Sequence, residues 1–368
     1  MDIAKNFPDC FVRLATEQDS AELSQLLKDI HSEGSMPLIE QRGDNFFGLL
    51  TMHLGQSDTF VFEKDEQIVG CVSCVVRKAW FEERQIEVGY FCDLRLKAEY
   101  RSKIKLTPVF HFIIDSIRSL YQVDTYFCSV LASNAKGINA TRFAGSETMT
   151  RYSMMSIQFV GNVDEPSHIV EKASCSDIDE LAIFLTESAK KRTLGFLQDQ
   201  ETLVKRIESW PSFSIQDFYL IRNAQDEIVA CAAPWNSHDL RQTHIVDYKG
   251  SMRWLKTLYN LEAKLRSFEP LPNAGDSFNY LTLTHLEIKE DDPKLLSSLL
   301  KAIYRDYRHS NLHMLSAMMV ENSPLNKAFS SFRTRKTDFE LRVFQHPESA
   351  YQNQQFKTER PGFEMALH

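Results

Sequence analysis

The stretch GYFCDLRLKAEYRSKIKL, residues 89–106, contains the transition that decides the fold of this chain. Its first part reads as a β-strand that ends in CDLRLK at residues 92–97. A polar, basic segment follows, and from Leu106 the sequence LTPVFHFIIDSIRSLY places apolar residues at helical spacing. We therefore predict a long strand, a basic loop and a helix in succession.

This transition occurs a second time, because THLEIK at residues 284–289 is also followed by an apolar-periodic segment, LLSSLLKAIYRDY. Two earlier segments repeat as well. ATEQDSAELSQLL, from Ala15, matches ASCSDIDELAIFL, from Ala173, and DEQIVGCV, from Asp65, matches DEIVACAA, from Asp226. Thr16 and Ser174 are predicted helix N-caps. The chain therefore carries two copies of one unit.

The spacing of the matches indicates an insertion in the second copy. The offset is 158 residues from Ala15 to Ala173 and 192 from Cys92 to Thr284. We predict an N-terminal domain at 1–160, a linker at 161–167, a C-terminal domain at 168–346 with a helical insertion at about 236–277, and a polar, loosely ordered tail at 347–368. The insertion contains an amphipathic helix, whose apolar stripe either covers a core or forms a lid over a ligand groove. That stripe comprises Trp254, Leu255, Leu258, Tyr259, Leu261 and Leu265.

Composition excludes several classes of function. The chain has 368 residues, 43% of them hydrophobic and 25% charged, and its net charge of −8 argues against a nucleic-acid partner. The N-terminal segment does not resemble a secretory signal, and no apolar stretch is long enough to span a bilayer, so we expect a cytoplasmic protein without a membrane partner. The seven cysteines are expected to be free thiols. Cys71 and Cys74 lie on one predicted strand and point to opposite faces, so no metal site is expected there.

The order of elements resembles the GNAT superfamily of N-acyltransferases. Each copy runs strand, one or two helices, hairpin, long strand, helix, strand, short helix and final strand. The residues 89–106 are similar to the fourth strand and pyrophosphate loop of that family, with Tyr100 and Arg101 at the place of its Tyr-Arg pair. The resemblance implies an α/β (α+β) fold of two tandem domains, each a central mixed, mostly antiparallel sheet flanked by helices.

The same resemblance implies that the N-terminal copy binds acetyl-CoA or another acyl-CoA. Backbone groups of Leu94, Arg95 and Leu96 would pair with the pantetheine arm, Asn134 would lie near the cofactor, and the phosphates would contact the loop after the strand. That loop comprises Arg101, Ser102, Lys103, Ile104 and Lys105.

This loop departs from the family pattern, because its glycine positions hold Ile104 and Leu106, or Lys105 if one residue is deleted. Lys103 and Lys105 could still neutralise phosphates. The C-terminal copy departs further, since Glu290, Asp291 and Asp292 stand where phosphate would bind. We expect that copy to be a scaffold or to bind the acceptor.

Two carboxylates are candidates for the catalytic base, Glu87 and Asp93. Both have the same parity along the strand, so they are expected to share one face with Arg95. An ion pair of Asp93 with Arg95 or another base is the structural alternative. The family's usual acid is a tyrosine after the Asn134 turn, where this chain has Arg142 and Phe143. In the second copy His285 and Glu287 match Asp93 and Arg95.

The sequence thus predicts an N-acyltransferase with the acyl-CoA site in the N-terminal copy and an unidentified amine acceptor in the groove between copies. The alternative is a catalytically silent, two-domain ligand-binding or scaffold protein, which the missing glycines and the missing tyrosine favour.

Overall fold

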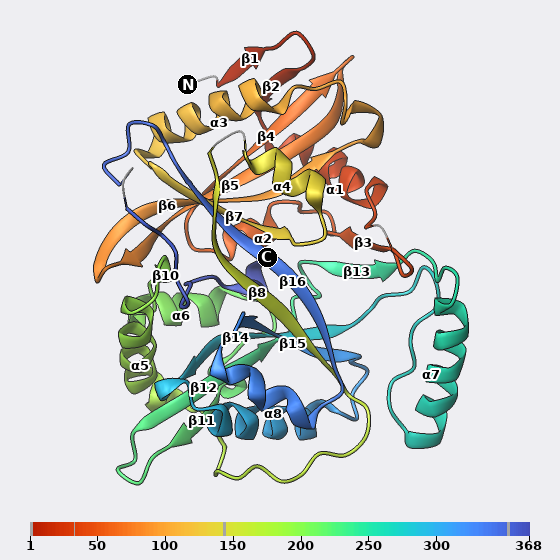
Figure 1. Ribbon diagram of the computed structural model, residues 1–368, viewed down its shortest axis with the longest axis vertical. Helices are drawn as coiled ribbons and strands as arrows, with labels where there is room; N and C mark the ends of the chain where they lie inside the picture. Colours follow the sequence, from red (N-terminus) through yellow and green to blue (C-terminus); the bar gives the residue numbers. More distant parts are fainter. Residues whose placement is uncertain (1–2, 33, 143–144, 352–353) are drawn as a thin grey trace.

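The computed structural model describes residues 3–32, 34–142, 145–351 and 354–368 (Figure 1). We use "N-terminal half" for the elements up to β8. Its helices are α1 (Ser20–Asp29), α2 (Gly48–Thr51), α3 (Leu106–Tyr121) and α4 (Ala135–Arg142). Its strands are β1 (Ala4–Asn6), β2 (Phe11–Leu14), β3 (Leu38–Gln41), β4 (Gln56–Lys64), β5 (Gln67–Phe81), β6 (Arg84–Leu96), β7 (Thr125–Leu131) and β8 (Glu147–Gln158).

The C-terminal half follows a coil that contains the predicted linker, residues 161–167. Its helices are α5 (Ile178–Lys190), α6 (Gln200–Ser209), α7 (Met252–Arg266) and α8 (Pro293–Tyr307). Its strands are β9 (Glu171–Lys172), β10 (Gly195–Phe196), β11 (Tyr219–Arg222), β12 (Ile228–Trp235), β13 (Gln242–Ile245), β14 (Tyr280–Ile288), β15 (Met314–Val320) and β16 (Thr334–Gln345).

One large, mostly antiparallel sheet runs through both halves. Among the described residues its order is β1-β2-β4-β5-β6-β7-β16-β8-β15-β14-β12-β11-β9. The last strand of each half crosses to the other: β16 lies between β7 and β8, and β8 lies between β16 and β15 (Figure 1). The predicted fold class is confirmed, but the exchange of final strands, which joins the two sheets into one, was not predicted.

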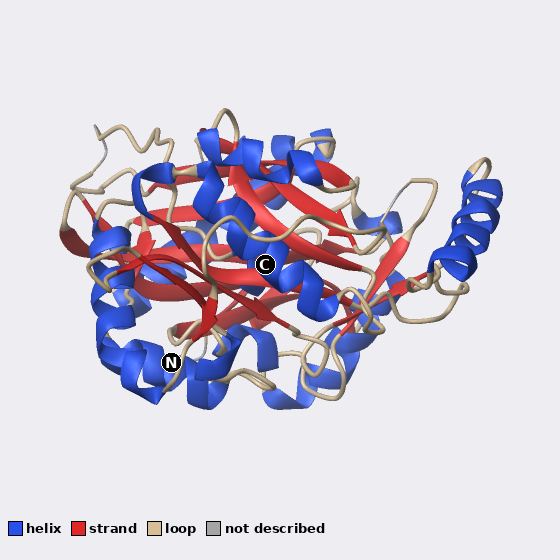
Figure 2. Ribbon diagram, turned by 90° about the horizontal axis from the view of Figure 1, so that it is seen from below, coloured by secondary structure: helices blue, strands red, loops and turns tan. Residues whose placement is uncertain are grey.

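Helices cover the sheet on both sides (Figure 2), and each half repeats the same arrangement. In the N-terminal half α1 packs on one face through Leu23 and Leu27, and α3 packs on the other through Ile113 and Ile117. In the C-terminal half α5 and α8 take the equivalent places. The predicted helix at 106–121 is confirmed as α3. Amphipathic patterns at matched positions therefore produce matched layers.

The predicted repeat is confirmed by contacts that recur at equivalent positions. The Glu22 carboxylate accepts a hydrogen bond from the Ile68 amide at 2.8 Å, and Glu180 accepts one from Ile228 at 2.8 Å. These bonds attach helix α1 to the start of β5 in one half and helix α5 to the start of β12 in the other. Because the matched residues make the same bond in both halves, the sequence similarity reflects a duplicated structure.

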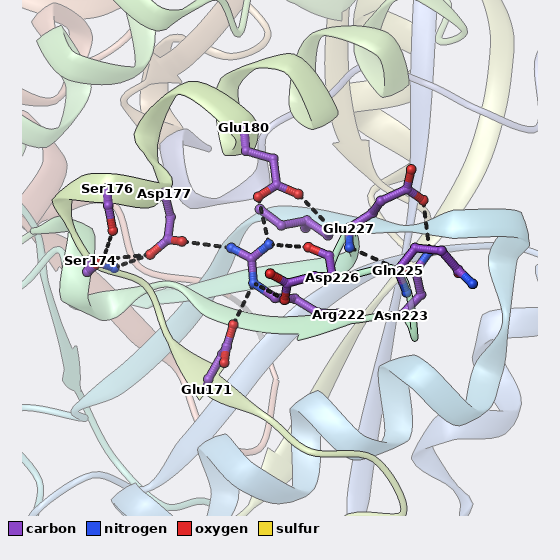
Figure 3. A network of polar contacts seen from close by, with 11 residues as sticks. Glu171, Ser174, Ser176, Asp177, Glu180, Arg222, Asn223, Gln225, Asp226 and Glu227 are labelled. Atoms are coloured by element: carbon purple, nitrogen blue, oxygen red, sulfur yellow. Dashed lines mark hydrogen bonds and ion pairs between the residues drawn. The ribbon is translucent and has the colours of Figure 1, made fainter.

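The predicted N-caps are also confirmed, since Thr16 with Asp19 and Ser174 with Asp177 each form a capping box. Figure 3 shows how the second box is anchored. Arg222 contacts Asp177 at 2.7 Å, Glu180 at 2.6 Å and Glu171 at 2.7 Å. This single guanidinium therefore joins β9, the cap and helix α5 to strand β11.

The C-terminal segment corrects a prediction. Residues 347–368 were expected to form a polar, loosely ordered tail, yet Phe356, Met365 and Leu367 are buried in the cores of the two halves. The Gly362 carbonyl accepts a hydrogen bond from the Arg77 guanidinium at 3.2 Å. Although the segment is mostly polar, its few apolar side chains are enough to anchor it, because each is buried at a different place in the core.

The CxxC pair lies as predicted. Cys71 and Cys74 are both buried in β5, and each belongs to the core cluster on a different face of the sheet. The two thiols therefore point away from each other.

Candidate functional site

Strands β6 and β7 separate in the middle of the sheet. They pair in parallel from Val88 opposite Thr125 to Phe91 opposite Cys128, and beyond this point they diverge. A cavity of about 410 Å³ opens between the diverging ends. Asp93, Leu94, Arg95 and Asn134, four of the predicted site residues, line it. A splayed strand pair exposes backbone groups that an extended ligand can reach.

A bulge in β6 causes this divergence. On β5, Ser73 aligns with Cys92 but Cys71 aligns with Arg95, so β6 carries one extra residue. Asp93 lies in the bulge with φ +53°, in the left-handed region that few non-glycine residues adopt. His285, its match in the second half, has φ +50° in a bulge of β14, where Cys231 of β12 aligns with Glu287 but Ala233 aligns with Thr284. Both halves therefore carry the same strained position on the equivalent strand.

The bulge overturns the expectation that Glu87 and Asp93 share a face with Arg95. One extra residue reverses the alternation of side chains, so positions before and after the bulge no longer have the same parity. Glu87 is exposed, aligns with Lys78 and does not line the cavity.

Asp93 forms a buried ion pair, with Arg42 rather than Arg95. The Arg42 guanidinium donates to both carboxylate oxygens of Asp93, at 2.7 and 2.8 Å, and contacts Glu40 at 2.8 Å. The side chains of Arg42 and Asp93 are only 3% and 6% exposed. Burial alone would lower the pKa of Arg42, but Asp93 and Glu40 raise it. Asp93 is thus held in a fixed orientation by two hydrogen bonds.

Glu40, which also lines the cavity, interacts with further guanidinium groups. Its carboxylate lies 3.8 Å from Arg95, and although burial would raise its pKa, Arg42, Arg241 and Arg95 lower the pKa to about 2. Arg241 comes from the second half, where β13 pairs with β3 and aligns Gln242 with Gln41. Arg241 also donates to the backbone oxygen of His368, so the three guanidinium groups face the carboxylates of Glu40 and Asp93 and this oxygen.

At the inner end of the cavity two further groups meet. The Tyr90 hydroxyl lies 2.8 Å from Nδ1 of His368, and both residues line the cavity. Burial and then Arg241 lower the pKa of His368 to about 4, so its imidazole is neutral at pH 7. Burial raises the pKa of Tyr90. A neutral imidazole beside a phenol can exchange a proton with a bound molecule.

The predicted phosphate loop has a different shape from a glycine-rich one. Ile104 is buried in the core under α3, and the Arg101 guanidinium donates to the Leu96 carbonyl at 3.2 Å. The Lys103 ammonium lies 5.1 Å from the centre of the Tyr100 ring. Ser102 and Lys105 are exposed, and Leu96 is buried at the end of β6. Residues 101–105 thus form a basic turn next to the cavity without lining it.

Asn134 and Arg142 flank the short helix α4. The Asn134 side chain accepts a hydrogen bond from the Gly137 amide at 2.9 Å and so holds the start of the helix at the edge of the cavity. Gly137 permits this approach, since a Cβ at this position would lie 2.5 Å from the side-chain nitrogen Nδ2 of Asn134. Arg142 ends the helix, and Phe143, which stands near the family's tyrosine position, lies outside the described residues.

The equivalent groove in the second half is filled by the chain itself. Strands β14 and β15 pair only from Tyr280 to Thr282, and the space beyond them shrinks to a cavity of about 120 Å³. Residues 359–365 line it, and the Glu364 carboxylate accepts hydrogen bonds from Thr284 at 2.8 Å and from the His285 amide at 3.3 Å. Arg192 pairs with Glu287 beside it. The second groove is therefore closed by the C-terminal segment.

Sequence reasoning missed five groups at the site, four of which come from outside the stretch 89–106. Glu40, Arg42, Tyr90, Arg241 and His368 carry no local motif, and Arg241 and His368 belong to segments predicted to be an insertion and a tail. Only the repeat offset, which located the insertion, gave an indirect signal for Arg241.

Comparison with known proteins supports the fold. No protein family and no curated protein matches the sequence. The structure resembles Saccharomyces cerevisiae N-myristoyltransferase with bound myristoyl-CoA, with a TM-score of 0.62, 11% identity, and coverage of 93% of this chain and 80% of that one. A second structure of the yeast enzyme gives a TM-score of 0.61 at 10% identity, with coverages of 92% and 83%.

A conserved Enterococcus faecalis protein described as a probable N-acyltransferase gives a TM-score of 0.50 at 9% identity, with coverages of 90% and 71%. The chain thus has the tandem GNAT-like fold expected from its sequence. At these identities the likeness concerns the fold alone.

Proposed function

We propose that the chain is an N-acyltransferase that binds acyl-CoA in the groove between β6 and β7 and transfers the acyl group to an amine. One observation carries this proposal: of two equivalent grooves, the one in the N-terminal half is open at about 410 Å³, whereas the other is filled by the chain's own residues 359–365. The guanidinium groups of Arg42, Arg95 and Arg241 beside the open groove suit a phosphate-bearing ligand. The yeast neighbour with bound myristoyl-CoA supports the ligand class.

In this proposal Leu94, Arg95 and Leu96 present their backbone to the pantetheine arm, and the basic turn 101–105 contacts the phosphates. The bulged backbone at Asp93 polarises the thioester carbonyl. Asp93 itself is a positioning residue, because both of its carboxylate oxygens already accept hydrogen bonds from buried Arg42. Glu87 has no role, since it lies outside the groove.

The imidazole of His368 is the proposed proton acceptor. As the amine nitrogen attacks the thioester carbon, the amine proton passes to the imidazole. The carbon–sulfur bond then breaks, and the departing thiolate takes that proton from the imidazolium to form CoA, which restores the neutral imidazole. Tyr90, hydrogen-bonded to that imidazole at 2.8 Å, orients the ring. We expect His368→Gln to lower kcat by about a hundredfold or more while leaving acyl-CoA binding intact.

Calorimetric titration with acetyl-CoA, myristoyl-CoA and free CoA tests the binding step. Ala140 lines the groove, so Ala140→Trp should fill it and weaken binding by at least about tenfold. Ala21→Trp, at an exposed position of α1, is the matched control and should bind as the wild type does. If both variants bound acyl-CoA with equal affinity, the ligand would not bind in this groove.

Charge reversal tests the basic turn. Arg101→Glu with Lys103→Glu should weaken acyl-CoA binding by about tenfold, whereas Arg84→Glu, at the far end of β6, should not. Release of free CoA with a panel of amines and peptides then separates the two functional classes. Binding without release would identify a silent binding protein of this fold.

A further inference from the structure

Helix α7 projects from the edge of the molecule and exposes an apolar stripe. In both views it lies apart from the other helices (Figures 1 and 2). Trp254, Leu258, Leu261 and Leu265 recur at intervals of four, three and four residues, so they lie on one helix face. Their exposed fractions are 78%, 62%, 58% and 78%. The stripe therefore covers neither a core nor the groove. Both interpretations drawn from the sequence, a core-covering helix and a lid, are wrong.

The opposite face holds the helix to the protein. Asn260 exchanges two hydrogen bonds with the backbone of Leu271, at 2.8 and 3.1 Å, and the Lys256 ammonium donates to Asn273 at 2.9 Å. Ala263 is buried, and the Tyr259 ring contacts Phe268. The attached face thus combines polar and apolar contacts, while the outward face is apolar, whereas an ordinary surface helix presents a polar face to solvent.

Charge distinguishes this helix from the rest of the chain. Between Met252 and Arg266 there are four basic residues, Arg253, Lys256, Lys264 and Arg266, against the single acidic Glu262, a local net charge of +3 in a chain of net charge −8. Arg333 adds a further cation 3.4 Å from Glu262. Arg253 lies 3.6 Å from Asp247, and Arg266 lies 3.3 Å from Glu262. The apolar stripe is thus accompanied by a net positive charge along the helix.

We propose that α7 is an interfacial helix that docks the protein on an anionic lipid bilayer. Leucines, a tryptophan and flanking Lys and Arg residues form the combination that lies in the headgroup region with its apolar face buried about 5–10 Å. The tryptophan suits this boundary, because its ring is apolar and its N–H polar. The sequence predicted no membrane partner because it has no apolar stretch long enough to span a bilayer, whereas a helix of this kind lies on the membrane surface.

A second copy of the chain fits the stripe less well. A helix of 15 residues is roughly 22 Å long and presents a face roughly 10 Å wide, so two such helices would bury on the order of 450 Å². Stable interfaces bury about 1,200–2,000 Å² in total. A bilayer needs no such complementary area, because it accepts each apolar side chain separately.

The insertion that carries α7 also reaches the groove. α7 follows β13, whose Gln242 pairs with Gln41 next to Arg42 and whose preceding residue is Arg241. The same insertion thus contributes a cation to the groove and an apolar helix to the outside. The docking proposal does not depend on the proposed reaction, since it concerns a different face.

Co-sedimentation of the full chain with vesicles tests the proposal. We expect binding to vesicles of phosphatidylcholine mixed with an equal amount of phosphatidylserine, weaker binding to phosphatidylcholine alone, and loss of binding as salt is raised. Leu258→Gln with Leu261→Gln should weaken binding by at least about tenfold. Arg253→Glu with Lys264→Glu should weaken it by about fivefold per residue on the anionic vesicles.

Ile183→Gln is the matched control, because Ile183 is 66% exposed on α5 and should not affect vesicle binding. Leu258 and Leu261 point into solvent, so the Leu258→Gln/Leu261→Gln variant should unfold at the wild-type temperature. No binding of the wild type to anionic vesicles, or equal binding by the Leu258→Gln/Leu261→Gln variant, would overturn the proposal. Loss of a dimer in that variant without any vesicle binding would overturn it in favour of a second copy.

Discussion

At the residue scale the site depends on Arg42, which holds Asp93 and Glu40 together in the interior. Its side chain is 3% exposed and contacts Asp93 at 2.7 Å and Glu40 at 2.8 Å. Removing one member of a buried ion pair leaves an uncompensated charge, which costs far more than the pair itself contributes. The bulge at Asp93 and the mouth of the groove are therefore tied to one guanidinium.

We predict that Arg42→Met lowers the free energy of unfolding by about 3–5 kcal/mol, because two carboxylates lose their partner. Arg95→Met is the matched control: Arg95 is more exposed and lies 3.8 Å from Glu40, so its loss should cost at most about 1 kcal/mol. Urea denaturation measures both values. Equal costs for the two variants would show that Arg42 is not the centre of this cluster.

Stability should also fall at mildly acidic pH because of His53. This side chain is buried, and burial followed by Arg77 lowers its pKa from 6.5 to about 3. Because the pKa of this histidine is lower in the folded protein than in the unfolded chain, the unfolded chain takes up the proton at a higher pH. The free energy of unfolding therefore falls as the pH decreases from 6.5 toward 3. Removing one such group should reduce the slope by up to about 1.4 kcal/mol per pH unit.

His53→Asn should therefore flatten the decline in stability between pH 6 and pH 4, whatever it does to stability at pH 7. Denaturation at a series of pH values gives the slope directly. The exposed His31 provides the control, since His31→Asn should leave the slope unchanged. An unaltered slope in His53→Asn would contradict the buried, neutral state.

At the element scale the two halves use the same devices with different outcomes. Each half begins with a capping box and attaches its first helix through a carboxylate, Glu22 or Glu180. The equivalent strands β6 and β14 bulge at Asp93 and His285. In one half the diverging strands leave an open groove, and in the other Glu364 fills it. Duplication thus supplied two grooves, of which one is occupied by the chain.

These matched bonds give a paired prediction. Glu22→Ala and Glu180→Ala should each cost about 1–3 kcal/mol, because each leaves a strand amide without its carboxylate partner. Thermal unfolding of the two variants should give similar losses. A large loss in one and none in the other would mean that the two bonds are not equivalent.

The sequence was sufficient for the repeat, the capped helices and the long strand before α3, because these depend on local spacing and capping residues. It could not show that β8 and β16 exchange places, since both orders leave the same apolar pattern. The bulge at Asp93 was hidden for the same reason, and it reversed the parity that had placed Glu87 beside Arg95. Burial of Phe356 and Leu367 depends on distant partners, and polar neighbours masked it.

At the scale of the whole molecule the exchanged strands make the halves interdependent. β16 pairs with β7 over Phe339–Gln345 and β8 pairs with β15 over Tyr152–Gln158, so unfolding of one half removes a strand from the other. β10 adds a further link, because Gly195 and Phe196 pair with Trp80 and Ala79 of β5. The sheet therefore behaves as one structure despite its duplicated origin.

We predict that both halves unfold in one cooperative transition. Trp80 reports on the N-terminal half, and Trp210 and Trp235 report on the C-terminal half. Variants that keep one reporter, with the other tryptophans replaced by phenylalanine, should show the same urea midpoint. Two separated midpoints would show that the halves fold independently.

The central claim is that the groove between β6 and β7 is the acyl-CoA site and that the groove between β14 and β15 is not. Hydrogen–deuterium exchange with and without acyl-CoA tests it most directly, because protection reports where backbone amides are covered. The account predicts protection of residues 92–96 and 129–141, with no change at 283–288. Protection confined to 283–288, or none at either groove with saturating ligand, would contradict it.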